Sequence, residues 1–141
     1  EIKRYTRKIS GPLLDRIDIH VHVPRVKYED MTSVAKAESS AVIRERVLAA
    51  REIQMERLRE WGIFCNAQMS HAILKKTCHL EPEAQKLLAQ AFQVMNLSAR
   101  SYDRIIKVAR TIADLDGAAT IEAKHVGEAI QLRDDVGLSV E

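Results

Sequence analysis

The chain has 141 residues, of which 46% are hydrophobic and 30% charged, and its formal net charge is only +2. This composition is typical of one soluble globular domain, and it excludes both a disordered tail and a second full domain. Aromatic residues make up 4% of the chain, and there are only 5 glycines and 3 prolines. Turn residues are therefore too few for a many-stranded sandwich or barrel, and we expect packed helices.

The cellular compartment is the next point that composition addresses. No apolar run approaches the roughly 20 residues that a membrane span needs, and the N-terminus lacks the apolar core of a signal peptide. We expect a cytoplasmic protein with no membrane partner. The first residue is Glu1 rather than methionine, so we expect the chain to be part of a longer protein. Cys65 and Cys78 are expected to be reduced thiols.

Residues 1–24 differ from the rest of the chain. Apolar and polar side chains alternate strictly over residues 17–23, which predicts a β-strand that Pro24 ends, and a short helical turn is expected just before it, at residues 13–16. One strand cannot form a sheet by itself. We therefore interpret this segment as the remnant of a domain whose other strands lie elsewhere.

Residues 25–38 are polar and lack periodicity, which indicates a linker, and residues 39–141 carry helical patterns. The first helix should be capped by Ser39 or Ser40 and should end before Gly62. The predicted helices run from there to about Trp61, from Ala67 to about Lys75, from Pro82 to Met95, from Ser98 to Leu115 with Gly117 closing it, and from Thr120 to about Arg133.

These helices predict a four- to five-helix bundle. The first helix should bury one apolar stripe, and its other face alternates charges of both signs, as solvated helix faces do. The expected stripe is Ile43, Val47, Ala50, Leu58 and Trp61, and the expected core of the bundle is Leu88, Phe92, Ile105, Val108, Ile112 and Ile130.

Several motifs that carry chemistry are absent from the sequence. There is no GxxxxGK[ST] phosphate loop, no GxGxxG and no HExxH, so this chain alone is not expected to bind a nucleotide in the usual way. Four potential zinc ligands, at 65, 71, 78 and 79, match no spacing with two close pairs, and buried thiols and surface histidines are the favoured interpretation. His20 and His22 lie on the polar face of the predicted strand.

The most informative segment runs from Ile9 to Ile19 and contains Ser-Gly-Pro-Leu-Leu-Asp-Arg-Ile-Asp. It places Arg16 at the end of a helical turn, directly before the predicted strand. Arg16 could simply pair with Asp15 or Asp18. Alternatively, an arginine at a subunit surface can reach the γ-phosphate bound by a neighbouring subunit, because its planar guanidinium matches phosphate oxygens.

Tyr5–Pro24 resembles the arginine-finger and fifth-strand region of AAA+ ATPases of the magnesium-chelatase-like group. Leu97–Leu115 resembles the lid helix of the ComM/YifB family within that group, and His125–Arg133 resembles the family's closing helix. The resemblance extends over nearly the whole chain. It implies a mainly α fold, an AAA+ lid bundle preceded by a short β-strand remnant of the ATPase core.

The resemblance also implies roles for individual residues. Arg16 matches the arginine finger, which acts in trans on the neighbouring subunit, and Arg100 matches the sensor-2 arginine, which contacts the nucleotide. Arg104, one helical turn after Arg100, is a further candidate for nucleotide binding, and Arg110 on the same helix is another. A basic residue in the first turn of a helix is unfavourable with respect to the helix dipole, so the position of Arg100 itself suggests an anion.

The longer protein is then expected to hydrolyse ATP with Mg²⁺ and to drive DNA branch migration in natural transformation. Its partners would be its own AAA+ core domain, neighbouring subunits of a homo-oligomeric ring, with a hexamer expected, and DNA. Two alternatives stay open. One is the ATPase subunit of a true magnesium chelatase. The other is a standalone helical module that binds nucleic acid or protein, which the near-neutral charge disfavours.

Overall fold

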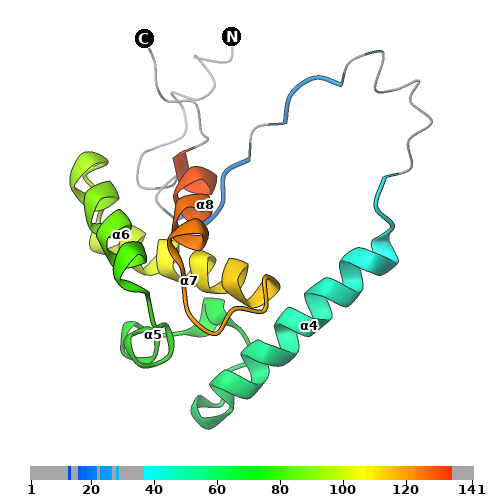
Figure 1. The fold of residues 1–141 in the computed structure, drawn as a ribbon, viewed down its shortest axis with the longest axis horizontal. Coiled ribbons are helices and arrows are strands. Elements are labelled where there is room, and N and C mark those ends of the chain that lie inside the picture. The colour runs from blue at the N-terminus through cyan, green and yellow to red at the C-terminus, as the bar shows by residue number, and fades with distance from the viewer. Residues whose placement is uncertain (1–12, 14–15, 22, 27, 29–36, 135–141) are drawn as a thin grey trace.

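The computed structural model describes residues 13, 16–21, 23–26, 28 and 37–134. This part is mainly helical, as predicted, and most of the predicted linker lies outside it. In the described residues, five α-helices follow one another (Figure 1): α4 Ser40–Leu58, α5 His71–Thr77, α6 Pro82–Val94, α7 Ala99–Leu115 and α8 Ala123–Asp134. None of them combines the length and the apolarity that crossing a bilayer requires.

The predicted ends of α4 are confirmed. The Ser39 hydroxyl accepts a hydrogen bond from the Val42 N–H at 3.4 Å and caps the helix. After Leu58 the chain tightens into a 3₁₀ turn, Arg59–Trp61, and reverses at Gly62. Gly62 has a φ of +66°, in the left-handed region that a side chain disfavours.

The predicted apolar stripe of α4 is only partly correct. Ala50 and Leu58 are buried, but Ile43 and Val47 are 42% and 45% exposed. The buried positions all lie in the C-terminal half of the helix, and the N-terminal half extends away from the other helices (Figure 1). A 19-residue helix is about 28 Å long, and the N-terminal half of α4 reaches beyond the helices that bury its C-terminal half.

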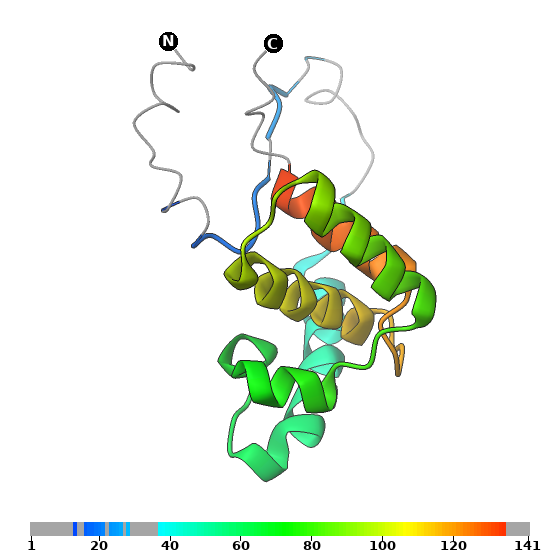
Figure 2. The same ribbon diagram turned by 90° about the vertical axis from the view of Figure 1, so that its left-hand side faces the viewer.

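α7 is the central element of the bundle. It lies between α6 and α8 on one side and α4 and α5 on the other (Figure 1 and Figure 2). The Ser98 hydroxyl accepts from the Ser101 N–H at 3.1 Å at its start, and Gly117, with a φ of +67°, follows its end, as predicted. Of the expected core, Leu88 and Ile105 are buried, whereas Phe92, Val108, Ile112 and Ile130 are partly buried at the edge. The buried core consists of Leu58, Met69, Leu74, Cys78, Ala84, Leu88, Ile105, Ile106, Ala109, Ala113, Ile121, Val126 and Ala129.

Two predicted helix starts differ from the structure. The helix expected from Ala67 divides into a 3₁₀ turn, Asn66–Gln68, and α5, because the Ser70 hydroxyl caps a new helix by accepting from the Ile73 N–H. The helix expected from Thr120 begins at Ala123 instead. Just before it, Ile121 is extended and pairs with Leu80 in a parallel bridge.

The predicted β-strand is not formed by the described residues 16–21 and 23. A strand requires a neighbouring edge, and no strand exists in the part of the chain that the structure describes. The segment instead bonds to helix ends: the His20 N–H donates to the Leu132 carbonyl at 2.6 Å. The helical turn predicted before it agrees with the Arg16 N–H donating to the Leu13 carbonyl at 3.0 Å. The domain boundaries at 24 and 38 stay a prediction.

A buried polar network joins α4 to α7. The Asp114 side chain is completely buried, and both of its oxygens accept hydrogen bonds from the Arg57 guanidinium at 2.7 Å. Asn66 completes the arrangement by accepting from Arg57 at 2.8 Å and donating to Asp114 at 2.9 Å. Three separate segments of the chain thus meet at one carboxylate.

A second arginine, Arg110, shares that carboxylate from within α7. Its Nε donates to Asp114 at 3.0 Å, and its two terminal nitrogens donate to the carbonyls of Ala118 and Ala119. Burial lowers the pKa of the Arg110 guanidinium, and the charge of Asp114 opposes that shift. Arg110 therefore fixes the loop between α7 and α8 and is not available to a ligand.

We predict that Asp114→Asn lowers the free energy of unfolding by about 3–5 kcal/mol, because removing one partner of a buried ion pair leaves charge uncompensated. Urea denaturation followed by circular dichroism measures this loss. Glu56→Gln is the control, since it removes a carboxylate from an exposed ion pair with Arg59 and should leave the midpoint nearly unchanged. Equal effects of the two substitutions would contradict the structural role of Asp114.

Candidate functional site

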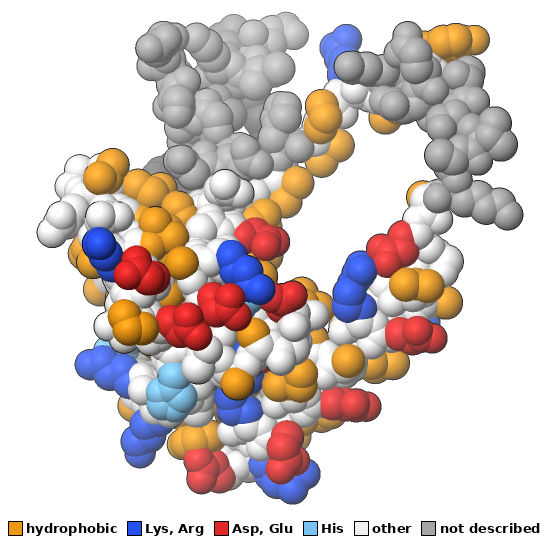
Figure 3. Space-filling model, viewed as in Figure 1, with side chains coloured by type: hydrophobic (Ala, Val, Ile, Leu, Met, Phe, Trp, Pro, Cys, Tyr) orange, Lys and Arg blue, Asp and Glu red, His pale blue; other side chains and the backbone are white. Residues whose placement is uncertain are grey.

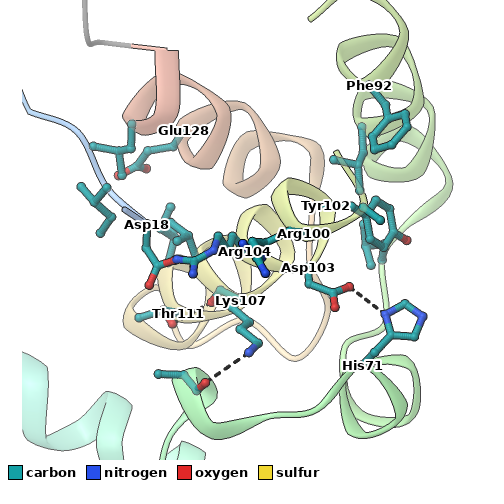
Figure 4. A pocket seen from close by; sticks show the side chains of 18 of the residues that line it. Asp18, His71, Phe92, Arg100, Tyr102, Asp103, Arg104, Lys107, Thr111 and Glu128 are labelled. Carbon is teal, nitrogen blue, oxygen red and sulfur yellow. Dashed lines mark hydrogen bonds and ion pairs between the residues drawn. The ribbon is translucent and has the colours of Figure 1, made fainter. Parts of the chain in front are cut away.

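The first two turns of α7 present the predicted nucleotide-binding arginines. Arg100 is exposed in the first turn, where the helix dipole is positive and free N–H groups favour an anion. Arg104 follows one turn later. Both line the same groove and lie on the side of α7 that faces it (Figure 4). The prediction that Arg100 and Arg104 share one face of the helix is therefore confirmed. Their proposed roles in nucleotide binding stay predictions.

Arg104 is engaged by the segment that carries Arg16. Its Nη1 donates to the backbone carbonyl of Arg16 at 2.6 Å and forms an ion pair with the Asp18 carboxylate. The Arg104 side chain is 24% exposed and that of Asp18 is 55% exposed, so the pair lies at the surface. This contact joins residues that are 86 and 88 positions apart in the sequence.

Arg16 itself is exposed at the N-terminal end of this segment. One alternative for Arg16 was a structural ion pair with Asp15 or Asp18. Asp15 lies outside the described residues, and Asp18 pairs with Arg104. The structure thus brings the backbone of Arg16 against α7.

The groove has a volume of about 1480 Å³ and is bordered by α5, α6, α7, α8 and the segment around Asp18. Apolar side chains from α6 and α7 line part of it, among them Leu88, Phe92 and Val108. Charged side chains of both signs line the rest: Asp18, Lys75, Arg100, Asp103, Arg104, Lys107 and Glu128. A groove of this kind suits a ligand or protein segment with both an apolar and an anionic part.

Two polar contacts hold the α5 side of the groove against α7. The His71 Nδ1 and the Asp103 carboxylate are 2.7 Å apart, and the Lys107 Nζ donates to the Ala67 carbonyl at 3.1 Å (Figure 4). Both pairs are exposed. They connect α5 and its preceding turn to the helix that carries the arginines.

The four cysteines and histidines considered for zinc do not form a site in the structure. Among the described residues, no group of three or more His, Cys, Asp or Glu side chains is arranged to hold a metal ion. Cys78 lies in the core next to Thr77 and Met69, and burial raises the pKa of its thiol. The His71 ring pairs with the Asp103 carboxylate, and Cys65 is half-buried in a different turn of the chain.

Sequence reasoning missed the residues that hold this site together. Asp18, His20 and Arg133 contact partners more than 80 positions away, and Asp114 collects donors from three segments. Nothing in their local pattern distinguishes them from ordinary surface residues. The one available signal is the pair of charged residues Arg110 and Asp114, four positions apart on the face of α7 that also carries its buried apolar residues.

Comparison with known families agrees with the sequence resemblance. The family model described as magnesium chelatase, subunit ChlI C-terminal, matches residues 37–133. A second model, magnesium chelatase, subunit ChlI, matches residues 1–31. The first of these covers most of the helical part of the chain.

Curated relatives extend this result. Competence protein ComM of Haemophilus influenzae is 39% identical over 134 residues, which are 94% of this chain and 26% of that protein. YifB of Escherichia coli is 37% identical over 131 residues, which are 92% of this chain and 25% of that protein. The chain spans about a quarter of the length of these relatives. The chain therefore belongs to the magnesium chelatase ChlI-like family, and it corresponds to the C-terminal part of proteins of the ComM and YifB type.

Proposed function

We propose that this chain is the lid of an AAA+ ATPase of the ComM type, whose ATP hydrolysis drives DNA branch migration in natural transformation. The observation that carries the proposal is the position of Arg100, which is exposed in the first turn of α7 and lines the groove, in a chain that matches this family. Helix N-termini and arginines are both suited to the phosphates of a nucleotide.

In this proposal Arg100 and Arg16 have different tasks. Arg100 contacts the nucleotide held between an ATPase core and the lid, so its charge links nucleotide state to lid position. Arg16 acts as the arginine finger in the site of the neighbouring subunit, where it stabilises charge that develops in the transition state. A finger of this kind is worth about 10³–10⁵ in turnover.

The proposal assigns ATP and Mg²⁺ binding mainly to the rest of the protein. The sequence lacks a phosphate loop, and the described residues form no cluster that fits Mg²⁺, so none of them is assigned to the metal. The partners proposed for the lid are its own AAA+ core, neighbouring subunits of a homo-oligomeric ring, expected to be a hexamer, and DNA bound by the assembled protein.

A second candidate is the ATPase subunit of a magnesium chelatase. The descriptions of both matching family models favour it, whereas the ComM relative favours DNA processing. The two can be separated in the complete protein: branched DNA should stimulate ATP hydrolysis under the first proposal, and a porphyrin with its partner subunits under the second. The face shown in Figure 3 intersperses acidic and basic side chains, which does not favour a standalone nucleic-acid module.

We predict that the 141-residue chain alone neither binds nor hydrolyses ATP measurably. Most phosphate affinity in this class comes from the backbone amides and the lysine of a phosphate loop, which this sequence does not contain. Isothermal titration with ATP and Mg²⁺ is the measurement. Micromolar binding by this chain would contradict its assignment as a lid.

We predict that Arg16→Ala in the complete protein lowers kcat by about 10³-fold or more with little change in ATP affinity, because the finger acts on the transition state. Arg25→Ala is a matched control, since Arg25 is exposed on the same stretch of chain. Mixing mutant and wild-type subunits tests the action in trans. If mutant subunits leave the turnover of their wild-type neighbours unchanged, Arg16 does not act in trans and is not a finger.

A further inference from the structure

Residues 16–20, here called the latch segment, are fastened to the lid at two places. At one end, Arg104 of α7 donates to the Arg16 carbonyl and pairs with Asp18. At the other end, the His20 backbone N–H donates a hydrogen bond to the Leu132 carbonyl. The His20 ring Nδ1 donates to the Arg133 carbonyl at 2.9 Å. The two fastening points belong to different helices, α7 and α8.

The α8 contact involves the last described turn of that helix. His20 supplies two donors, one to the carbonyl of Leu132 and one to the carbonyl of Arg133. The final carbonyls of a helix are suited to such outside donors, because the last turn of a helix leaves its carbonyls without partners within the helix. This end of the latch segment is bonded to α8 and does not involve Arg104.

The α7 contact has a different character. Arg104 and Asp18 form a charge-assisted pair at the surface, which a change in lid position can break at small cost. Arg133 adds a weaker contact, because its Nη1 donates to the Ile17 carbonyl at 3.3 Å while its Nη2 donates to the Ser101 hydroxyl of α7 at 2.9 Å. The backbone that carries Arg16 thus follows the first turns of α7.

The same turns of α7 carry Arg100. Residues 100 and 104 are one turn apart on a continuous helix, so any rotation of α7 that moves the Arg100 side chain also moves Arg104. Through the Arg104 contact, that motion reaches the carbonyl of Arg16 directly. The geometry provides a mechanical link between two arginines that are 84 positions apart in the sequence.

We propose that Arg104 is a positioning residue that couples α7 to the latch segment, and that it sets the position of Arg16 instead of binding the nucleotide. This inference rests on the proposed function for the roles of Arg16 and Arg100. It adds a route by which the nucleotide state sensed by Arg100 adjusts the position of the arginine finger.

The test uses Arg104→Met in the complete protein, with Lys107→Met as a matched control on the same helix. Lys107 loses the same charge, but its Nζ contacts the Ala67 carbonyl within the lid and not the latch segment. Hydrogen exchange of the peptide that covers residues 16–21 should be about tenfold faster in Arg104→Met, since a charge-assisted contact is lost. Lys107→Met should leave that exchange unchanged.

Steady-state kinetics supply the second readout. Arg104→Met should lower kcat and leave the Kd for ATP within about twofold, whereas Arg100→Met should raise that Kd by about tenfold or more. Reversing the two charges, with Asp18→Arg and Arg104→Asp together, should restore part of the slow hydrogen exchange through the ion pair alone, because an aspartate cannot donate to the Arg16 carbonyl. A structural defect in α7 would not be repaired by this charge reversal.

Two results would overturn the proposal. Unchanged exchange of residues 16–21 in Arg104→Met would show that Arg104 does not hold the latch segment. An increase in the Kd for ATP as large as that of Arg100→Met would show that Arg104 binds the nucleotide. If Arg16→Ala leaves turnover unchanged, the proposed function fails. The hydrogen-exchange measurement then still decides whether Arg104 holds the latch segment.

Discussion

The carboxylate of Asp114 is the interaction on which the rest of this structure depends. It is completely buried and receives hydrogen bonds from Arg57, Arg110 and Asn66. A buried charge is tolerated only when its partners satisfy it fully, and here the partners come from α4, from the turn before α5 and from α7 itself. The position of α7 relative to its neighbours is therefore fixed at its C-terminal half by one group.

The network around Asp114 at the C-terminal end of α7 also orients the N-terminal end of that helix. The helix is continuous from Ala99 to Leu115, so the network around Asp114 sets the direction in which the first two turns point. Those turns carry Arg100 and Arg104 toward the groove. The C-terminal half of α7 is anchored by a buried network, while the ion pair at the other half, between Arg104 and Asp18 of the latch segment, lies at the surface.

The particular errors of sequence reasoning have a common origin. Periodicity places Ile43 and Val47 on an apolar stripe, yet both are exposed because none of the other described helices extends that far along α4. Alternation at residues 17–23 predicts a strand, but a strand depends on a neighbour, and the described chain offers helix ends instead. By contrast, the caps at Ser39 and Ser98 and the reversals at Gly62 and Gly117 depend on a few adjacent residues, and they were predicted correctly.

Local spacing and residue type account for the helical class, the capping residues and the shared face of Arg100 and Arg104, and the resemblance that indicated the family rests on the same features. Three contacts appear only in the folded chain: Arg104 with the Arg16 backbone, Arg110 with the buried Asp114, and His20 with the last described turn of α8. These contacts join residues far apart in sequence or depend on burial. Their energies come from desolvation and from geometry set by the packed helices, which no local pattern encodes.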